Sequence, residues 1–248
     1  MSQDVSTAPN IISGQPKHLW FLTLTYSMVI VLANWFDPRL ISLFGLTTDA
    51  GTLIFPLTFL LSDLITEVYG YKYARRAIWC GFLFNLLFII YGQIIIHMPN
   101  PAFSTQNEEF DALISTNIRI ILASIISYFS SEPLNSFVMA KIKIRMAGRY
   151  MGIRFLSSTL LASGIDSAFF SVIAFYGVIN NINLFSLIFT MWFIKVFIEI
   201  LGLPLSIRLS KKLKKIEQID IYDKRTNFNI LNLDTKYSEK DNEFSRTR

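Results

Sequence analysis

The sequence predicts an all-α polytopic membrane protein: a bundle of six transmembrane helices with both termini in the cytoplasm. Six stretches are apolar and long enough to cross a bilayer, which takes about 20 residues per helix. Charged residues make up 17 % of the 248 residues, against about 25 % in soluble domains, and the mean hydropathy is +0.43. The Lys and Arg residues outside the stretches gather in alternate loops, which is typical of a multi-pass protein.

The six apolar stretches divide the chain into a leader (1–17), a transmembrane transport domain (18–210) and a tail (211–248). We expect the leader to be disordered and the tail to be basic and disordered, because both are polar and poor in apolar residues. Pro133 lacks a backbone N–H and predicts a break or a kink in the fourth helix. The predicted helices lie at residues 18–36, 51–69, 77–97, 118–140, 154–178 and 184–207.

The distribution of Lys and Arg predicts the orientation. The loops after the first, third and fifth stretches contain one basic residue, Arg39. The loops after the second and fourth stretches and the tail hold the others, including Lys72, Arg75, Arg76, Lys141, Lys143, Arg145, Arg149, Lys211, Lys212, Lys214 and Lys215. Because cytoplasmic loops are rich in Lys and Arg, we expect a multi-pass protein of the bacterial inner membrane with both termini inside.

Charged side chains inside the apolar stretches are the main indication of function. A charge within a bilayer is costly unless it faces a partner or a wet cavity. The chain nevertheless spreads both signs over four stretches, which predicts a polar chamber inside the bundle, as in transporters. These residues are Asp63, Glu67, Arg119, Glu132, Arg154, Asp166, Lys195 and Glu199.

The spacing of these residues favours a cavity. Asp63 and Glu67 are four apart and share a helix face. Lys195 and Glu199 have the same spacing and form either a self-neutralising ion pair or a pair that faces a cavity. We favour the cavity, because burying an ion pair has a desolvation cost that its attraction need not recover. Asp166, beside a stripe of serines, is the first candidate for a carboxylate that contacts substrate.

The predicted roles follow from charge. The candidates for substrate binding are Asp63, Glu67, Glu132, Asp166, Lys195 and Glu199. The candidates for charge balance or gating are Arg119, Arg154, Arg75 and Arg76, although the last two also fit simple cytoplasmic loop charges. Carboxylates outnumber cations in the stretches, which favours a neutral or cationic ligand with several N–H donors.

The sequence lacks the motifs that are typical of metal-binding proteins, nucleotide hydrolases and several enzyme classes. Cys80 is the one cysteine, and neither His18 nor His97 has a neighbour at metal-ligand spacing, so we expect no metal site and no cofactor. The chain has no phosphate-binding GxxxxGK[ST] loop, no HExxH and no GxSxG, and we expect no enzymatic activity. The basic residues lie in loops, so we expect the partners to be the bilayer, a small purine-like substrate and an energising ion or protein, and no nucleic acid.

Residues 55–79 resemble the hallmark of the queuosine precursor transporter family, also called the vitamin uptake transporter family. The segment reads FPLTFLLSDLITEVYGYKYARRAIW and fits F-P-L-x-F-L-x-x-D-x-x-x-E-x-Y-G followed by A-R-R. RIILASIISYFSSEPLNSFVMAKIK and RFLSSTLLASGIDSAFFSVIAFYG resemble the family's next two polar helices, and Lys195, Glu199 and Pro204 fit its sixth. The resemblance covers roughly residues 20–230.

The resemblance implies a six-helix inner-membrane importer of 7-deazaguanine bases, such as the cyano or aminomethyl form or queuine, for tRNA modification. It also implies a fold like the substrate-binding components of energy-coupling-factor transporters. A flat base would stack on an aromatic side chain, for which Trp192, Phe55, Phe169 and Tyr26 are candidates. The alternatives are a subunit for another vitamin-like solute that works with a separate ATPase, and an intramembrane aspartyl protease using Asp63 and Asp166.

Overall fold

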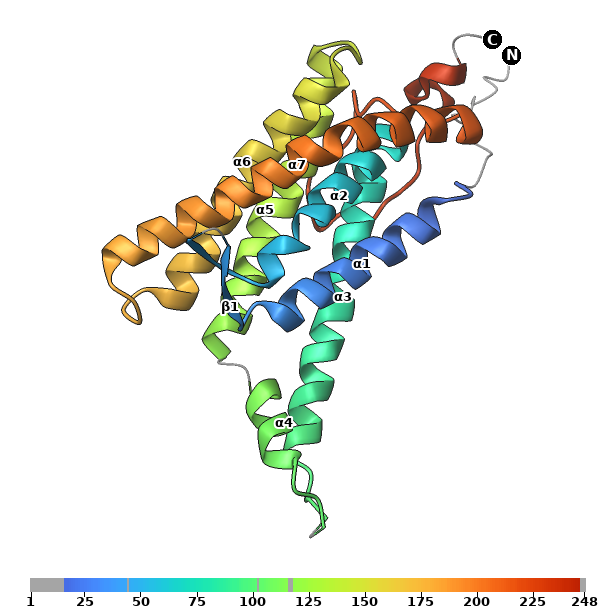
Figure 1. Ribbon diagram of the computed structural model, residues 1–248. Coiled ribbons are helices and arrows are strands. Elements are labelled where there is room, and N and C mark those ends of the chain that lie inside the picture. Colours follow the sequence, from blue (N-terminus) through green and yellow to red (C-terminus); the bar gives the residue numbers. More distant parts are fainter. Residues whose placement is uncertain (1–15, 44, 102, 116–117, 246–248) are drawn as a thin grey trace, which may run out of the picture.

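The computed structural model describes residues 16–43, 45–101, 103–115 and 118–245, which form a helical bundle with one small hairpin (Figure 1). Within these residues, six helical segments are long and apolar enough to cross a membrane, which confirms the predicted fold class. They are α1 (Leu19–Phe36), a 3₁₀ turn (Gly51–Leu53) with α2 (Pro56–Tyr69), α3 (Tyr71–Ile96), α5 (Ile118–Arg145), α6 (Met151–Phe175) and α7 (Asn181–Glu217). The expected disorder of the leader concerns mainly residues 1–15, which lie outside the described residues.

Helix α2 lies at the centre of the bundle. It packs against α1, α3, α5 and α7 and touches α6, and 67 % of its membrane-length segment is buried. Around it, α5 packs along α6, α6 along α7, and α1 along α3. Since α2 meets every other long helix, its polar side chains can reach partners from all of them.

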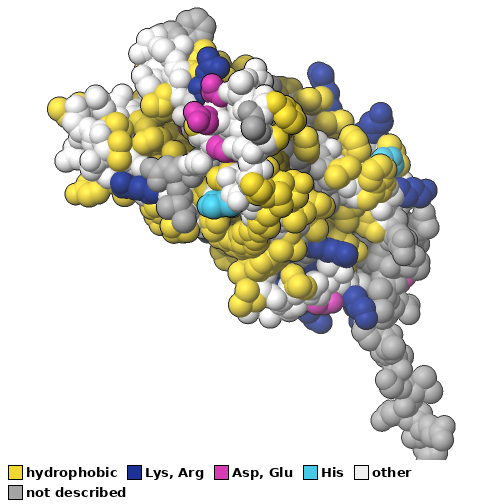
Figure 2. Space-filling model, turned by 90° about the horizontal axis from the view of Figure 1, so that it is seen from below, with side chains coloured by type: hydrophobic (Ala, Val, Ile, Leu, Met, Phe, Trp, Pro, Cys, Tyr) yellow, Lys and Arg dark blue, Asp and Glu magenta, His cyan; other side chains and the backbone are white. Residues whose placement is uncertain are grey.

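The outer surface of the bundle is apolar. Figure 2 shows hydrophobic side chains spread over the visible face, with scattered Lys and Arg side chains and a small group of Asp and Glu among them. Large exposed side chains come from α1, α3 and α7, among them Trp20, Phe84, Leu87, Phe185 and Phe197. Soluble monomers rarely expose so wide an apolar surface, and lipid chains would cover it.

Two short elements that the sequence analysis did not predict lie at the end of the bundle away from the start of α1 and the end of α7 (Figure 1). Strands β1 (Leu40–Leu43) and β2 (Leu46–Asp49) form an antiparallel hairpin between α1 and α2. Helix α4 (Asn107–Ile114) precedes α5. The hairpin matters for function, because it brings Asp49 against the bundle, where the side chain is 1 % exposed.

Helix α5 continues through Pro133 without a break. The proline removes the donor for the Phe129 carbonyl alone, so the turns on either side keep their hydrogen bonds. Ser130 Oγ donates to the Ile126 carbonyl at 2.7 Å and Ser131 Oγ to the Tyr128 carbonyl at 3.5 Å. Of the two expectations for this helix, the structure therefore contradicts the break.

The C-terminal segment (residues 218–245) differs from the disordered tail that we expected. Helix α7 extends to Glu217, which accepts hydrogen bonds from the Lys17 and His18 backbone at 2.9 and 2.8 Å. The chain then turns back along the bundle, burying Ile221 and Tyr237. A few apolar anchors therefore order a segment whose overall composition is polar.

Backbone carbonyls of this segment bind side chains of α3. Arg75 donates to the carbonyls of Asn227 and Asn229 through Nη1, at 2.9 and 2.7 Å, and to that of Asp234 through Nη2, at 2.9 Å. Trp79 Nε1 donates to the Ile230 carbonyl at 2.8 Å. Arg75, a candidate for charge balance or gating, thus anchors the C-terminal segment and is 1 % exposed.

Gly70, between α2 and α3, offers a test of this packing. Its φ is +87°, and a Cβ there would lie 2.6 Å from both Ile221 Cγ2 and the Tyr237 hydroxyl. Gly177 has a φ of +79° with nothing within 4 Å. We expect Gly70→Ala to lower the free energy of unfolding by about 2–5 kcal/mol, from backbone strain plus overlap, and Gly177→Ala by about 1–2 kcal/mol from strain alone. Equal shifts in thermal unfolding in detergent would contradict a packed C-terminal segment.

Candidate functional site

Charged side chains are buried where α2, α5, α6 and α7 meet. The six predicted substrate-binding residues all lie there, and none is more than 3 % exposed. They fall into three groups along the bundle: an ion-pair cluster around Glu67, a group of carboxyls without cations, and a pair formed by Asp166 and Lys195. The first two groups each join residues from at least three helices, and the pair joins α6 and α7.

The Glu67 cluster lies toward the end of the bundle that holds the start of α1. Arg154 donates to both Glu67 oxygens, at 2.6 and 3.0 Å. Lys214 Nζ lies 2.5 Å from Glu67 Oε1 and 2.8 Å from Asp220 Oδ1. Lys143 Nζ lies 2.7 Å from the same Asp220 oxygen and 3.9 Å from Glu67. These five residues connect α2, α5, α6, α7 and the C-terminal segment, and they occupy both Glu67 oxygens.

The middle group contains Asp63, Glu132 and Glu199. Asn135 Nδ2 donates to Asp63 Oδ1 at 2.8 Å, and Ser158 Oγ lies 3.4 Å from both Asp63 oxygens. All four oxygens of Glu132 and Glu199 are buried and have no hydrogen-bond partner among the described residues. This part of the interior therefore holds three carboxyls without a cation bound to them.

Asp166 and Lys195 form an ion pair between α6 and α7. Lys195 Nζ lies 2.5 Å from Asp166 Oδ2, and Ser131 Oγ on α5 donates to Asp166 Oδ1 at 3.1 Å. The Lys195 amine also lies 4.7 Å from the centre of the Phe55 ring. The sequence spacing pointed to a Lys195–Glu199 pair, whereas the structure gives Lys195 a partner on another helix.

The predicted arginines occupy different places. Arg154 belongs to the Glu67 cluster and Arg75 binds the C-terminal segment. Arg119 donates to the carbonyls of Ile173 and Tyr176 at the end of α6. Arg76 is exposed. Of the four predicted arginines, Arg154 forms an ion pair with an interior carboxylate. Lys143 and Lys214, which the sequence analysis assigned to a loop and the tail, do so as well.

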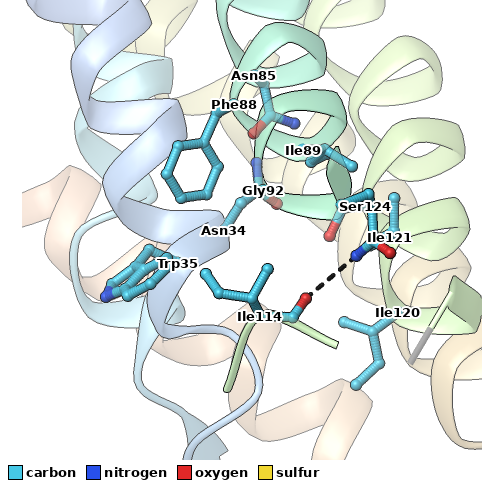
Figure 3. Close-up of a pocket in the computed structure, with 11 residues that line it drawn as sticks. Asn34, Trp35, Asn85, Phe88, Ile89, Gly92, Ile114, Ile120, Ile121 and Ser124 are labelled. Carbon is cyan, nitrogen blue, oxygen red and sulfur yellow. Dashed lines mark hydrogen bonds between the residues drawn. The ribbon is translucent and has the colours of Figure 1, made fainter. Parts of the chain in front are cut away.

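Two small cavities adjoin at the hairpin end of the bundle and share Asn34 and Ser124. The outer cavity, of about 50 Å³, is lined by Trp35 and Phe88 and by amides that include Asn85 (Figure 3). The inner cavity, of about 20 Å³, is lined by Phe55 and the Asp166–Lys195 pair. A water needs roughly 10–15 Å³ and ligand pockets span about 300–1,000 Å³, so this form is closed to all but water.

Larger hollows lie on the outside of the bundle, along α1 and α3. Their volumes are about 650 and 500 Å³. The second is lined almost wholly by apolar side chains such as Leu24, Met28 and Leu87. Lipid chains would fill such grooves, so the internal cavities are the better candidates for a polar ligand.

The structure adds two carboxyls that the sequence analysis did not single out. Asp37, just after α1, and Asp49, at the end of β2, both line the inner cavity. Asp49 accepts from Thr52 N at 2.6 Å and from Thr52 Oγ1 at 2.7 Å. Burial, and next the charge of Asp49, raise the pKa of Asp37 well above its usual range. Their positions on either side of a short apolar loop were the signal available in the sequence.

The chain is similar to known transporters over most of its length. A family model described as "Putative vitamin uptake transporter" matches residues 49–209. The "Probable queuosine precursor transporter" of Bacillus subtilis (strain 168) is 26 % identical over 192 residues, which cover 76 % of this chain and 82 % of that protein. The "Queuosine precursor transporter" of Escherichia coli (strain K12) is 29 % identical over 163 residues, 64 % and 70 % of the two chains. No solved structure matches.

These matches confirm the resemblance found in the sequence motifs and the prediction of a transporter. The matched residues include α2, α5 and α6 and most of α7, and hence the charged residues of the interior other than Asp37, Lys214 and Asp220. With six membrane-length helices around that interior, the chain belongs to the family of vitamin uptake transporters.

Proposed function

We propose that this chain imports a queuosine precursor, a 7-deazaguanine base, across the bacterial inner membrane. The observation that carries the proposal is the similarity to two relatives whose names state this activity, over 76 % and 64 % of this chain. The interior supports it, because the Asp166 carboxylate in the inner cavity offers an acceptor for the N–H donors of a guanine-like edge. The proposal includes both termini in the cytoplasm, which the positive-inside rule supports.

The proposed binding site is the inner cavity, widened when the transporter opens. Asp166 would accept N–H donors of the base, while Lys195, whose Nζ lies 2.5 Å from Asp166 Oδ2, holds that carboxylate in position. Phe55 lies beside the pair and offers a flat apolar face. Of the four aromatic candidates it fits best, since Tyr26 is fully buried against Tyr128, Trp192 donates to the Leu160 carbonyl and Phe169 is 45 % exposed on the outside.

The Glu67 cluster is better suited to closing the cytoplasmic side than to contacting substrate. Its oxygens are already occupied by side chains of the same chain, and the C-terminal segment covers it. We propose that access alternates between the hairpin end and this end. Arg154, Lys143 and Lys214 would then release Glu67 when the cytoplasmic side opens, which assigns Arg154 the gating role expected from the sequence.

The experiment measures queuosine in the tRNA of cells that cannot make the precursor, each deazaguanine being fed at low concentration. We expect this chain to restore queuosine with at least one compound. Phe55→Ala should lower initial uptake of that compound about 5–150-fold, because stacking of a base on an aromatic ring is worth about 1–3 kcal/mol. Phe169→Ala, which removes an outward-facing ring, should leave uptake unchanged.

Two outcomes would contradict the proposal. If membrane-inserted protein restores no queuosine with any deazaguanine, the substrate is another vitamin-like solute or an ATPase partner is needed. If Phe169→Ala reduces uptake and Phe55→Ala does not, the substrate is a deazaguanine but binds away from the inner cavity.

A further inference from the structure

Glu132 on α5 and Glu199 on α7 are both 0 % exposed, and none of their oxygens has a hydrogen-bond partner among the described residues. An ionised carboxylate in such surroundings would have lost its contact with water and would have gained no hydrogen-bond donor in exchange, which is costly. The cations that could compensate are already engaged: Lys195 with Asp166, and Arg154, Lys143 and Lys214 in the Glu67 cluster. In this closed form the two carboxyls are therefore expected to be neutral, each carrying a proton.

The hydroxyls around Glu132 do not change this conclusion. Those of Tyr26 on α1 and of Thr58 and Ser62 on α2 lie nearby, but none meets hydrogen-bond geometry with a Glu132 oxygen. They are engaged elsewhere: Tyr26 with the Tyr128 hydroxyl, Thr58 with the Phe55 carbonyl, and Ser62 with Ser136. The surroundings of Glu132 thus contain neutral hydroxyls and no cation bound to it.

The carboxyls form a continuous series through the bundle. Asp37 interacts electrostatically with Asp166, Asp166 with Glu132, Glu132 with Asp63, and Asp63 with Glu199. Glu132, Asp63 and Glu199 also have uncharged neighbours. These are Thr159 and Ser158 on α6 and Asn135 on α5. Glu67 lies one turn beyond Asp63 on α2. The series therefore runs from the cavity at the hairpin end to the Glu67 cluster.

We propose that Glu132 and Glu199 carry the protons that drive import, so that the transporter is a proton symporter. This inference rests on the proposed function. In the form open to the outside, Glu132 and Glu199 bind protons from water; closing over a bound base removes the water and requires both carboxyls to be neutral. Opening to the cytoplasm hydrates them again, and the two protons leave with the substrate. The transporter then returns with water in place of the base, so that the two carboxyls stay ionised on the way back. No bond other than the O–H bond forms or breaks. Coupling follows because a bound base fills the chamber and favours closing.

The test uses the purified full chain in proteoliposomes with the radiolabelled deazaguanine that restores queuosine. With acid outside, we expect accumulation above equilibrium by about tenfold per pH unit of gradient for each proton carried, and hence about a hundredfold per pH unit when Glu132 and Glu199 each carry one, abolished by a protonophore. Glu199→Gln should lower this accumulation to about tenfold per pH unit and keep exchange of external for internal substrate, because a neutral amide still permits closing. Glu109→Gln, at an exposed carboxylate of α4, should behave as the parent.

A second measurement reads the carboxyls directly, without substrate. Infrared spectra of the parent at neutral pH should show the carbonyl stretch of protonated carboxyls, weakened in Glu132→Gln and Glu199→Gln and unchanged in Glu109→Gln. Proton coupling would be overturned if substrate exchanged but did not accumulate in response to the pH gradient, or if the spectra showed no such band. Either result would leave the proposed function intact. Absence of exchange for every deazaguanine would overturn the proposed function and the symport of that cargo together.

Discussion

Glu67→Gln is expected to destabilise the protein more than Arg154→Met, although each removes one charge from the same ion pair. The Glu67 cluster contains three cations and two carboxylates. Without the Glu67 charge, three buried cations share Asp220 alone, whereas without Arg154 two lysines still balance two carboxylates. Breaking a buried pair by removing one partner costs about 3–5 kcal/mol. We expect Glu67→Gln at the upper end of that range and Arg154→Met at or below the lower end.

The measurement is the free energy of unfolding in detergent, followed by tryptophan fluorescence. The control is Arg76→Gln, an exposed basic residue next to Arg75 on α3, which should change stability by less than about 0.5 kcal/mol. A larger loss for Arg154→Met would show that the two direct hydrogen bonds from the guanidinium outweigh the charge balance of the cluster.

The bundle and the buried charges could be predicted because both follow from the cost of polar groups in lipid. Six apolar stretches of sufficient length had one plausible fold class, and a charge within any of them had to face inward. Asp63, Glu132, Asp166 and Glu199 therefore lie in the interior as their positions required. Their partners could not be predicted, since pairing depends on which helices are neighbours and on their rotation.

Lys143 and Lys214 show why the sequence analysis predicted only part of the Glu67 cluster. Both lie just beyond the apolar stretches, where a basic residue is expected for reasons of topology alone. The structure places them inside because α5 and α7 continue to Arg145 and Glu217 and because the C-terminal segment folds back over them. A segment with few apolar residues resembles a disordered one by composition, and its order here depends on side chains such as Arg75 far away in sequence.

Asp166→Asn and Lys195→Met are each expected to lower import at least about tenfold, while the double variant regains stability without regaining import. Each single variant leaves one buried charge without its partner at 2.5 Å. Asp166→Asn also removes the carboxylate proposed to accept from the base. A hydrogen bond to a charged group is worth about 1.5–3 kcal/mol, so initial uptake should fall at least about tenfold.

A double-mutant cycle separates the two roles of this pair. Unfolding measurements on the parent, both single variants and the double variant should give a coupling energy of about 0.5–3 kcal/mol, because removing both charges together leaves neither unpaired. Uptake by the double variant should stay as low as in Asp166→Asn. If uptake returned with stability, the pair would act in helix packing alone, and the contact with the base would have to come from Asp37, Asp49 or the amides of the outer cavity.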